Sequence, residues 1–409
     1  MANFIPVAVL AAVAILITFK ERIGFVKPWQ AMLGGALLVL AFGFPAQDAV
    51  SSIDWGVMLF LFGMFVLASM LVESGYLKHL GYKVLRRFSA PQAVLLAFVF
   101  AIGLGAAFLL NDTVAIIGVP LAFALARRSK IGATPLVVAV AVAVTVGSVA
   151  SPIGNPQNFI IASQQGIGEP FEVFAKYLLV PTLVSLAGLA ALLWVMFPEL
   201  GKLKTFDEDH EERKGDYWAA RAGFQGVVAL SAVRALSGFW DAIPRFGLFW
   251  IALAGAAIAV LLSRKPSNAL KADYGTLAFF AGMFVLMRAV WDSGIFQQFL
   301  PSVGALAEPN MVLASSILLS QVLSNVPFVI LYVKALGTGA GAQTLALLAA
   351  GSTLAGGITY LGAASNIIVM QAAEKEGGTL PFREFTIAGV ASVGISMAAV
   401  LCWMKLTGL

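Results

Sequence analysis

One segment of the sequence occurs twice, as DWGVMLFLFGMFVLASMLVESG at residues 54–75 and as DYGTLAFFAGMFVLMRAVWDSG at residues 273–294. The two copies align without a gap, and 10 of their 22 positions are identical. Apolar helices share a few Leu or Ala residues through composition alone. A shared Gly-Met-Phe-Val-Leu word, flanked by Asp-x-Gly and Ser-Gly, instead indicates an internal repeat. The chain is therefore predicted to be a duplication of two related halves.

The composition is that of an integral membrane protein. Of the 409 residues, 60% are hydrophobic and 11% are charged, and the mean hydropathy is +0.91, far outside the range of soluble globular proteins. Several apolar runs reach about 16 to 20 residues, the length that crosses a bilayer as a helix, whereas barrel strands would alternate over about ten residues. We therefore expect an all-α, multi-pass protein of the cell (inner) membrane.

The order of the apolar runs divides the chain into a first half at residues 1–198 and a second half at 223–409. A hydrophilic segment at 199–222 is predicted to be a cytoplasmic linker that joins them. Its acidic run at 207–212 is interpreted as a solvated connector and not as a metal site. Each half is expected to contain about five transmembrane helices, one re-entrant hairpin and one broken helix, in an inverted repeat.

The distribution of Lys and Arg predicts the topology. With the N-terminus outside, 20 of the 26 Lys and Arg residues fall in cytoplasmic loops. This holds only if the runs at 90–127 and 311–334 each enter and leave on one side of the membrane. Both are therefore predicted to be re-entrant hairpins, and the broken helices follow them at 134–161 and 344–370.

Four polar breaks interrupt the apolar runs, two in each half. They place Asn, Ser and Thr beside Pro or Gly, or at a hairpin tip. Pro and Gly free backbone groups from the helix, and in lipid those groups need a cavity, an ion or a ligand. Secondary transporters with inverted repeats bind substrate at such breaks. The predicted substrate-binding and coupling residues are Asn111, Asp112, Thr113, Ser151, Asn155, Asn158, Ser324, Asn325, Ser365 and Asn366.

Asp112 is the only carboxyl in the four breaks, and its counterpart in the second half is Val326 or a residue beside it. A carboxyl at membrane depth costs about 2.5 to 3.5 kcal/mol on insertion scales, so such residues usually line a substrate or proton path. The alternative is that Asn111 and Asp112 only cap a helix. Because the breaks contain no Lys, Arg or His, a neutral polyhydroxyl solute or a cation suits them better than a dianion. We predict that Asp112 carries the coupling proton.

An intramembrane enzyme is the competing class. The sequence contains no His-Glu-x-x-His, Gly-x-Ser-x-Gly or Walker A motif, and a hydrolase would need an acid/base pair at depth where only one carboxyl is present. The single cysteine, Cys402, excludes a multi-thiolate metal site. We expect no enzyme activity, no catalytic residue, no cofactor and no bound metal. The net charge of +5 comes from short loops and does not indicate a nucleic-acid partner.

Two intramembrane arginines lie outside the breaks. Arg288 precedes Asp292 by one helical turn, and this spacing predicts an ion pair. Arg234 lies in a weakly apolar span, where both a structural and a functional role stay open.

The breaks resemble those of the ion transporter superfamily, in the branch of arsenite permeases, sodium/proton antiporters and divalent anion symporters. Leu110-Asn111-Asp112-Thr113 looks like the Asn-Asp hairpin tip of arsenite permeases, and Ser324-Asn325-Val326-Pro327 is similar to their Asn-Asn-x-Pro. The breaks at 154–158 and 362–366 complete a resemblance over nearly the whole chain. Dicarboxylate symporters of the superfamily carry Ser-Asn-Thr at both tips, a pattern that neither tip matches. The resemblance implies an elevator-like movement against a scaffold that dimerises in many members.

The leading prediction is a secondary transporter for proton-coupled efflux of arsenite or antimonite, which would confer arsenical resistance. A sodium/proton antiporter that uses Asp112 directly is the first alternative. A symporter of anions or dicarboxylates, with sodium as the coupling ion, is the second. The expected partners are the lipid bilayer and a small inorganic or anionic substrate. A homodimer and a separate ATPase subunit stay open.

Overall fold

The computed structural model describes residues 4–18, 27–206, 216–238, 240 and 242–408. Within these ranges the chain forms helices and connecting turns, without a strand, so the all-α fold predicted from the apolar runs is confirmed. Five helical stretches are long and apolar enough to cross a membrane, at 55–74, 91–108, 170–196, 274–292 and 382–407. The acidic run at 207–212 lies outside the described residues.

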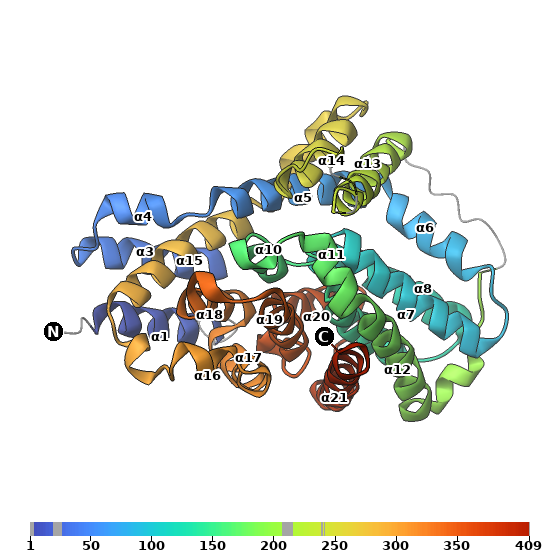
Figure 1. Cartoon of the computed structure of the whole chain (residues 1–409). Helices are drawn as coiled ribbons and strands as arrows, with labels where there is room; N and C mark the ends of the chain where they lie inside the picture. Colours follow the sequence, from blue (N-terminus) through green and yellow to red (C-terminus); the bar gives the residue numbers. More distant parts are fainter. Residues whose placement is uncertain (1–3, 19–26, 207–215, 239, 241, 409) are drawn as a thin grey trace.

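Six helices form a first group, in which α5 packs on α14, α14 on α13 and α15 on α3 (Figure 1). They are α1 (Ile5–Thr18), α3 (Pro28–Ala41), α5 (Trp55–Ser74), α13 (Tyr217–Leu236), α14 (Phe249–Leu261) and α15 (Tyr274–Asp292). Small residues allow the backbones to approach closely. A Cβ on Gly63 of α5 would lie 2.7 Å from the carbonyl carbon of Ala252 on α14.

The repeated segments become α5 and α15, and these two helices run in opposite directions. The Nζ of Lys271, just before α15 begins, lies 2.6 Å from the Oε2 of Glu73 at the end of α5. The two helices start alike. Asp54 Oδ1 accepts a hydrogen bond from Val57 N at 3.0 Å, and Asp273 Oδ1 accepts one from Thr276 N at 2.9 Å. An antiparallel pair of like helices is what an inverted repeat requires.

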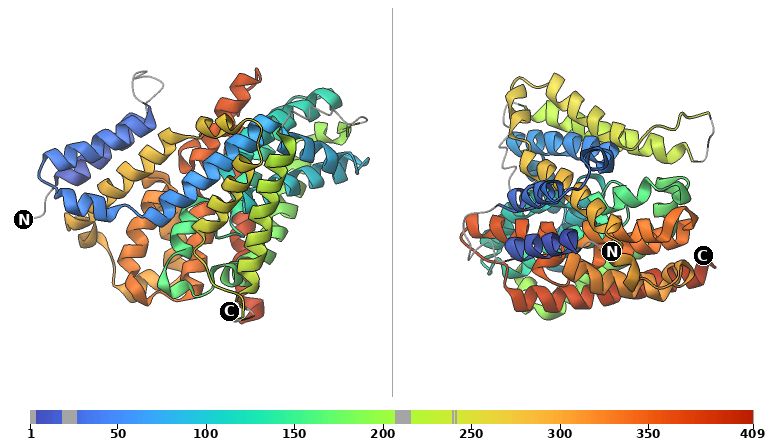
Figure 2. Two further views of the ribbon diagram at one scale, coloured as in Figure 1. Left: turned by 90° about the horizontal axis from the view of Figure 1, so that it is seen from above. Right: turned by 90° about the vertical axis from the view of Figure 1, so that its left-hand side faces the viewer.

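The remaining long helices form a second group, which carries both hairpins and both broken helices. They are α7 (Pro91–Phe108), α8 (Asn111–Ser129), α9 (Thr134–Ser148), α10 (Pro156–Ala162), α12 (Val180–Met196), α17 (Pro309–Leu323), α18 (Asn325–Leu336), α19 (Ala342–Ala355), α20 (Ala364–Lys375) and α21 (Phe382–Thr407). In the right-hand view of Figure 2, the orange and red helices of this group lie opposite α13 and α14.

Helices α7 and α8 form an antiparallel hairpin. A Cβ on Gly105, near the end of α7, would lie 3.6 Å from Val114 near the start of α8. Further from the turn, a Cβ on Gly118 would lie 2.9 Å from Ile102. Residues further from the turn on α7 therefore contact residues further from the turn on α8, as in an antiparallel hairpin. The prediction that this hairpin is re-entrant stays a prediction.

The two halves interlock within the second group. Helix α8 of the first hairpin packs on α20, the second part of the broken helix in the second half, and α18 of the second hairpin packs on α10. Each hairpin thus lies against the broken helix of the other half. Because each hairpin packs on the broken helix of the other half, the four breaks lie close together.

Short elements connect the groups. They are α4 (Ala46–Ser52), α6 (Tyr76–Leu85), η1 (Gln165–Ile167), α11 (Pro170–Phe174), η2 (Ala175–Leu179), η3 (Pro198–Lys202), η4 (Pro266–Lys271), η5 (Phe296–Phe299), α16 (Val303–Ala307), η6 (Gly337–Gly339) and η7 (Tyr360–Gly362). Within the predicted linker at 199–222, α13 already begins at Tyr217. The Asp216 carboxylate fixes this start by accepting hydrogen bonds from Ser263 Oγ at 2.8 Å and Arg264 N at 2.9 Å.

The predicted ion pair on α15 is confirmed. Arg288 Nε donates to Asp292 Oδ2 at 2.6 Å, and both side chains are about one-third exposed. An exposed pair of this kind contributes about 0 to 1 kcal/mol, so it shapes the end of the helix more than it stabilises the fold.

Candidate functional site

In the first broken helix, the side-chain amide of Asn158 bonds to the backbone carbonyls that the break leaves free. Helix α9 ends at Ser148 and α10 begins at Pro156. The fully buried Asn158 donates from Nδ2 to the carbonyl oxygens of Ser148 and Ser151, both at 3.0 Å. Asn155 caps α10, since its Oδ1 accepts from Asn158 N at 2.8 Å. Its Nδ2 donates to Ser148 Oγ at 3.1 Å. Side-chain amides thus satisfy the backbone carbonyls that the break frees from the helix.

The second broken helix repeats this arrangement 208 residues later. Asn366, the counterpart of Asn158, donates from Nδ2 to the carbonyl oxygens of Gly356 at 2.7 Å and Thr359 at 2.9 Å. Gly356 and Thr359 are the counterparts of Ser148 and Ser151 at the same offset. The two breaks therefore share one hydrogen-bond pattern in addition to a shared position in the sequence.

Glycine is required at one matching position in each break. A Cβ on Gly154 would lie 2.5 Å from the Ser148 carbonyl oxygen, and a Cβ on Gly362 would lie 2.9 Å from that of Gly356. Real Cβ atoms do not approach a backbone oxygen so closely. Both glycines let the chain fold back on the end of the preceding helix.

Asn111 joins the first hairpin to both halves. Its backbone N donates to the Gly154 carbonyl oxygen at 3.0 Å, and its Nδ2 donates to Ser365 Oγ at 3.4 Å. The predicted position of the hairpin tip needs a correction. The turn itself is formed by Leu109 and Leu110, and Asn111, Asp112 and Thr113 form the first turn of α8. This shift moves the polar side chains onto a helix start, and the backbone N–H groups of Asp112 and Thr113 donate there to Asn111 Oδ1 and the Leu110 carbonyl oxygen.

Asp112 differs from its neighbours in exposure. Asn111 and Thr113 are buried, whereas Asp112 is half-buried. The sequence left open the alternative that Asn111 and Asp112 only cap a helix. Only Asn111 uses its side chain in this way, because its Oδ1 accepts a hydrogen bond from Asp112 N at 3.0 Å. In the part of the chain that the structure describes, the Asp112 carboxyl has no hydrogen-bond or ion-pair partner. It is therefore available to a proton, a cation or a substrate hydroxyl.

The second half contains two unsatisfied amide oxygens, one at its hairpin tip and one in its broken helix. Ser324 joins α17 to α18 with a φ of +67°, a left-handed conformation that non-glycine residues rarely adopt. Asn325 follows, and a Cβ on Gly356 would lie 2.6 Å from its Nδ2, so this tip lies against the second break. The Oδ1 atoms of Asn325 and Asn366 are buried and have no hydrogen-bond partner. A buried acceptor without a donor is costly unless a ligand or an ion binds it.

Sequence reasoning missed Thr353, which links the two halves. Its Oγ1 donates to Asn158 Oδ1 at 3.0 Å and accepts from Asn155 Nδ2 at 3.3 Å. Thr353 lies 208 residues after Thr145, and the repeat offset applied to polar residues within the apolar helices would have found it. Thr145 makes no such link, because its Oγ1 donates to Ala141 O of its own helix at 3.2 Å.

Gln321 on α17 was also missed. Its Nε2 donates to the Ala355 carbonyl oxygen at 2.7 Å, and its Oε1 accepts from Thr359 Oγ1 at 2.9 Å. It ties the second hairpin to the second break. The sequence signal that could have found it is an amide side chain one turn before the hairpin tip.

Arg234 lies apart from the breaks. Its guanidinium binds the Glu169 carboxylate, the Phe246 carbonyl oxygen at 3.1 Å and Ser237 Oγ at 2.9 Å. Arg245 also binds Glu169, at 3.0 Å. These contacts support the structural role that the sequence left open, and they hold the start of α11 against α13.

Comparisons with known proteins indicate a membrane transporter. The family model described as "Citrate transporter" (CitMHS) matches residues 12–350. "Inner membrane protein YbiR" of Escherichia coli is 32% identical over 297 residues, covering 70% of this chain and 73% of that protein. The "46 kDa membrane protein" of Mycobacterium leprae is 26% identical and covers 97% of this chain and 99% of that protein. "Silicon efflux transporter LSI3" of rice is 25% identical over 84% of each chain.

One solved structure shares the fold. The YdaH transporter of Alcanivorax borkumensis superposes with a TM-score of 0.54 over 91% of this chain and 88% of that chain. The sequence identity is 16%, so the likeness concerns the fold alone.

Proposed function

Because the chain belongs to the citrate transporter family, and is therefore a multi-pass membrane transporter and not an enzyme, we propose that it exports a small uncharged polyhydroxylated solute in exchange for protons. Arsenite, antimonite and silicic acid form this class. All three are largely uncharged hydroxides at neutral pH. The membership agrees with the superfamily resemblance of the breaks, while the arsenite permease type remains part of the proposal.

The charge of the breaks carries this proposal. Four helix starts, those of α8, α10, α18 and α20, are joined through Asn111, Asn158, Thr353 and Asn325. Helix starts carry a partial positive charge. Around them lie amides and hydroxyls, a single carboxyl and no basic side chain. Hydroxyl groups of a neutral solute can both donate to and accept from such a set, and they need no counterion.

Asp112 supplies the coupling in this proposal. An unpaired carboxyl beside the substrate can hold a proton in one half of the cycle and release it in the other. Substrate and proton would then occupy the site in alternation, which produces exchange. The relative named as a silicon efflux transporter supports the direction and the solute class.

An elevator movement is the proposed means of alternating access. The hairpins and broken helices all lie in the second group and would move as one unit against the first. Glu169 belongs to the segment that leads from α10 to α12, and it binds Arg234 and Arg245 near α13 and α14. Such a movement would have to break this contact. The first group would offer the surface for a homodimer.

Sodium-coupled symport of citrate or another anion is the second candidate. The unpaired Oδ1 atoms of Asn325 and Asn366 favour it, because amide oxygens are ligands that a small cation accepts. A bound cation would offset the charge of an anionic substrate. A sodium/proton antiporter that uses Asp112 remains compatible with the same residues.

Everted membrane vesicles test the choice between these candidates. Arsenite, silicic acid, citrate and sodium are offered separately, and a pH-sensitive dye follows the lumen. We expect uptake of arsenite or silicic acid that needs an imposed pH gradient and also dissipates it. The Asp112→Asn variant should lose both effects, whereas the matched Asp292→Asn variant, whose carboxyl pairs with Arg288, should keep them. Sodium-dependent citrate transport without any response to the hydroxides would sink the proposal.

A further inference from the structure

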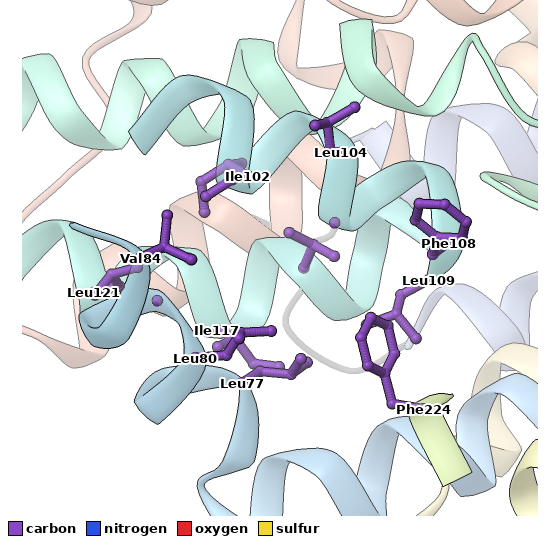
Figure 3. A pocket seen from close by; sticks show the side chains of 15 residues that line it. Leu77, Leu80, Val84, Ile102, Leu104, Phe108, Leu109, Ile117, Leu121 and Phe224 are labelled. Atoms are coloured by element: carbon purple, nitrogen blue, oxygen red, sulfur yellow. The ribbon is translucent and has the colours of Figure 1, made fainter. Parts of the chain in front are cut away.

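An apolar cavity of about 240 Å³ lies behind the first hairpin, away from the polar breaks (Figure 3). Its walls come from α6, α7 and α8, and Phe224 of α13 closes it from the other helix group. Leu77, Leu80, Gly81 and Val84 form one face of α6, with the spacing of a helical stripe. None of the lining side chains is charged. The cavity therefore selects an apolar occupant.

The cavity opens toward the surrounding lipid. Leu104 and Phe108, both in its wall on α7, are 37% and 36% exposed on the surface of the helix bundle. An exposed apolar surface on a hairpin that lies within the membrane faces acyl chains and not water. Figure 3 shows Leu104 and Phe108 on α7, with Leu109 following at the turn and Phe224 facing it from α13.

The other face of α6 and the turn after it are basic. Lys83, Arg86 and Arg87 are exposed at the end of the helix whose inner face lines the cavity. Across the cavity, Arg221 lies one turn before Phe224 on α13 and stacks over the Trp218 ring at 5.1 Å. Trp218 is 65% exposed and Phe88 is 38% exposed, and exposed aromatic residues of this kind are common at the level of lipid headgroups.

These observations together assign an occupant. We propose that the cavity binds an acyl chain of an anionic phospholipid, whose phosphate lies among the basic residues around α6. Juxtamembrane basic clusters attract anionic headgroups, and Arg binds phosphate through paired N–H groups. The cavity is smaller than a typical pocket for a drug-sized ligand, about 300 to 1,000 Å³, but its wholly apolar lining suits a segment of a flexible acyl chain. Lipid binding here is independent of the solute that the transporter carries.

The bound chain would contact the element that holds the substrate. Val114 and Gly105 line the cavity, and Val114 lies one turn after Asn111 on α8. A chain in this place fills the space between the hairpin and Phe224 of the first group. The lipid would therefore support the hairpin from behind and leave the polar atoms of the breaks untouched.

Photolabelling of the full-length protein tests the proposal. The protein is placed in phosphatidylcholine vesicles that contain traces of either phosphatidylglycerol or phosphatidylcholine with a photoreactive acyl chain. After illumination, labelled peptides are mapped. We expect phosphatidylglycerol to label the segments 77–84, 101–109 and 114–121 more strongly than phosphatidylcholine does. Equal labelling by both lipids, or labelling spread evenly over α21 and the other lipid-facing helices, would overturn it.

Two pairs of variants locate the chain and the headgroup. Ala101→Phe fills the cavity from its half-buried wall and should lose the label, while Leu96→Phe, exposed on the same helix but outside the cavity, should keep it. The double variant Lys83→Gln, Arg87→Gln should lose the preference for phosphatidylglycerol, while Lys375→Gln at the end of α20 should retain it. Thermal unfolding shows whether Ala101→Phe is folded. If it is not, the surface variants alone decide, and an unchanged lipid preference in the double variant contradicts the proposal.

Discussion

The two broken helices share one backbone design but differ in how fully their polar atoms are satisfied. In the first, Asn158 uses Nδ2 for two carbonyls and Oδ1 for the Thr353 hydroxyl. In the second, Asn366 uses Nδ2 in the same way, but its Oδ1 is buried without a partner. The first break is thus complete within the protein. The second leaves an acceptor for whatever the site binds.

The hairpins show the opposite asymmetry in charge. The first carries Asp112 at the start of α8, and the second carries Val326 at the corresponding place on α18. The carboxyl therefore belongs to the first half, whereas the unsatisfied amide oxygens belong to the second. We infer that duplication supplied a symmetric framework, and that later divergence gave coupling to one half and ligand acceptance to the other.

Removal of the charge at Asp112 should have the largest effect. Asp112→Asn keeps the size of the side chain and its place on α8 but cannot release a proton at neutral pH. We expect proton-coupled transport to be abolished in the vesicle assay, with no change in the amount of folded protein. The variant Asp112→Asn with Val326→Asp moves the carboxyl to the other tip. Proton coupling that survives in Asp112→Asn alone would show that another group carries the proton.

The two amides that close the breaks provide the next comparison. Asn158→Ala and Asn366→Ala each leave two buried carbonyls without donors, and each unsatisfied group costs about 1 to 3 kcal/mol. Asn158→Ala also deprives the Thr353 hydroxyl of its acceptor, so it should unfold at a lower denaturant concentration in mixed micelles. For transport per folded molecule we expect the opposite order, with the larger loss in Asn366→Ala. Asn366→Ala removes the unpaired Oδ1, which is the acceptor proposed for the ligand, and the fraction that remains folded should lose transport.

An equal loss of transport per folded molecule in both variants would contradict this division between the halves. Thermal unfolding followed by tryptophan fluorescence gives the folded fraction, and uptake of arsenite or silicic acid gives the activity.

Much of the framework could be predicted from the sequence because it follows from backbone physics. The apolar runs predict the helices, and Pro, Gly and Asn in mid-run predict the breaks at 151–158 and 359–366. What the sequence could not provide is which polar atoms meet. Thr353 and Gln321 are each one of several polar residues in a largely apolar helix, and only the packing of α19 and α17 on the breaks brings them to Asn158 and Thr359.

The hairpin tip illustrates the same limit on a smaller scale. Asn, Asp and Thr favour turns and helix caps, so the sequence places them in the turn. In the structure, Leu109 and Leu110 form the turn and are both fully buried, because apolar residues suit a packed turn at this depth. The polar residues then begin the helix, where Asn111 reaches Gly154 and Ser365.

A smaller effect is expected from the hydroxyl that links the halves. Thr353→Val keeps the shape but leaves the buried Asn158 Oδ1 without a donor, at a cost of about 1 to 3 kcal/mol in the free energy of unfolding. Thr145→Val is the matched control at the same repeat position. Its hydroxyl only adds a second bond to the Ala141 carbonyl, so its loss should cost less than about 1 kcal/mol. Equal costs would mean that the link through Thr353 contributes little.

The smallest effects are expected at the starts of the repeated helices, where the two halves agree. Asp54 and Asp273 cap α5 and α15 through hydrogen bonds from Val57 N and Thr276 N. Loss of an N-cap carboxylate costs about 1 kcal/mol, so Asp54→Ala and Asp273→Ala should lower the free energy of unfolding by similar amounts. Asp273 also accepts from Thr276 Oγ1 at 2.6 Å, but this exposed bond adds little against water. Transport should be unchanged in Asp54→Ala, since Asp54 bonds to no break. Asp273 differs because its negative charge acts on Asp112, so Asp273→Ala tests stability alone. A large transport defect in Asp54→Ala would extend the asymmetry of the halves from the breaks to the first helix group.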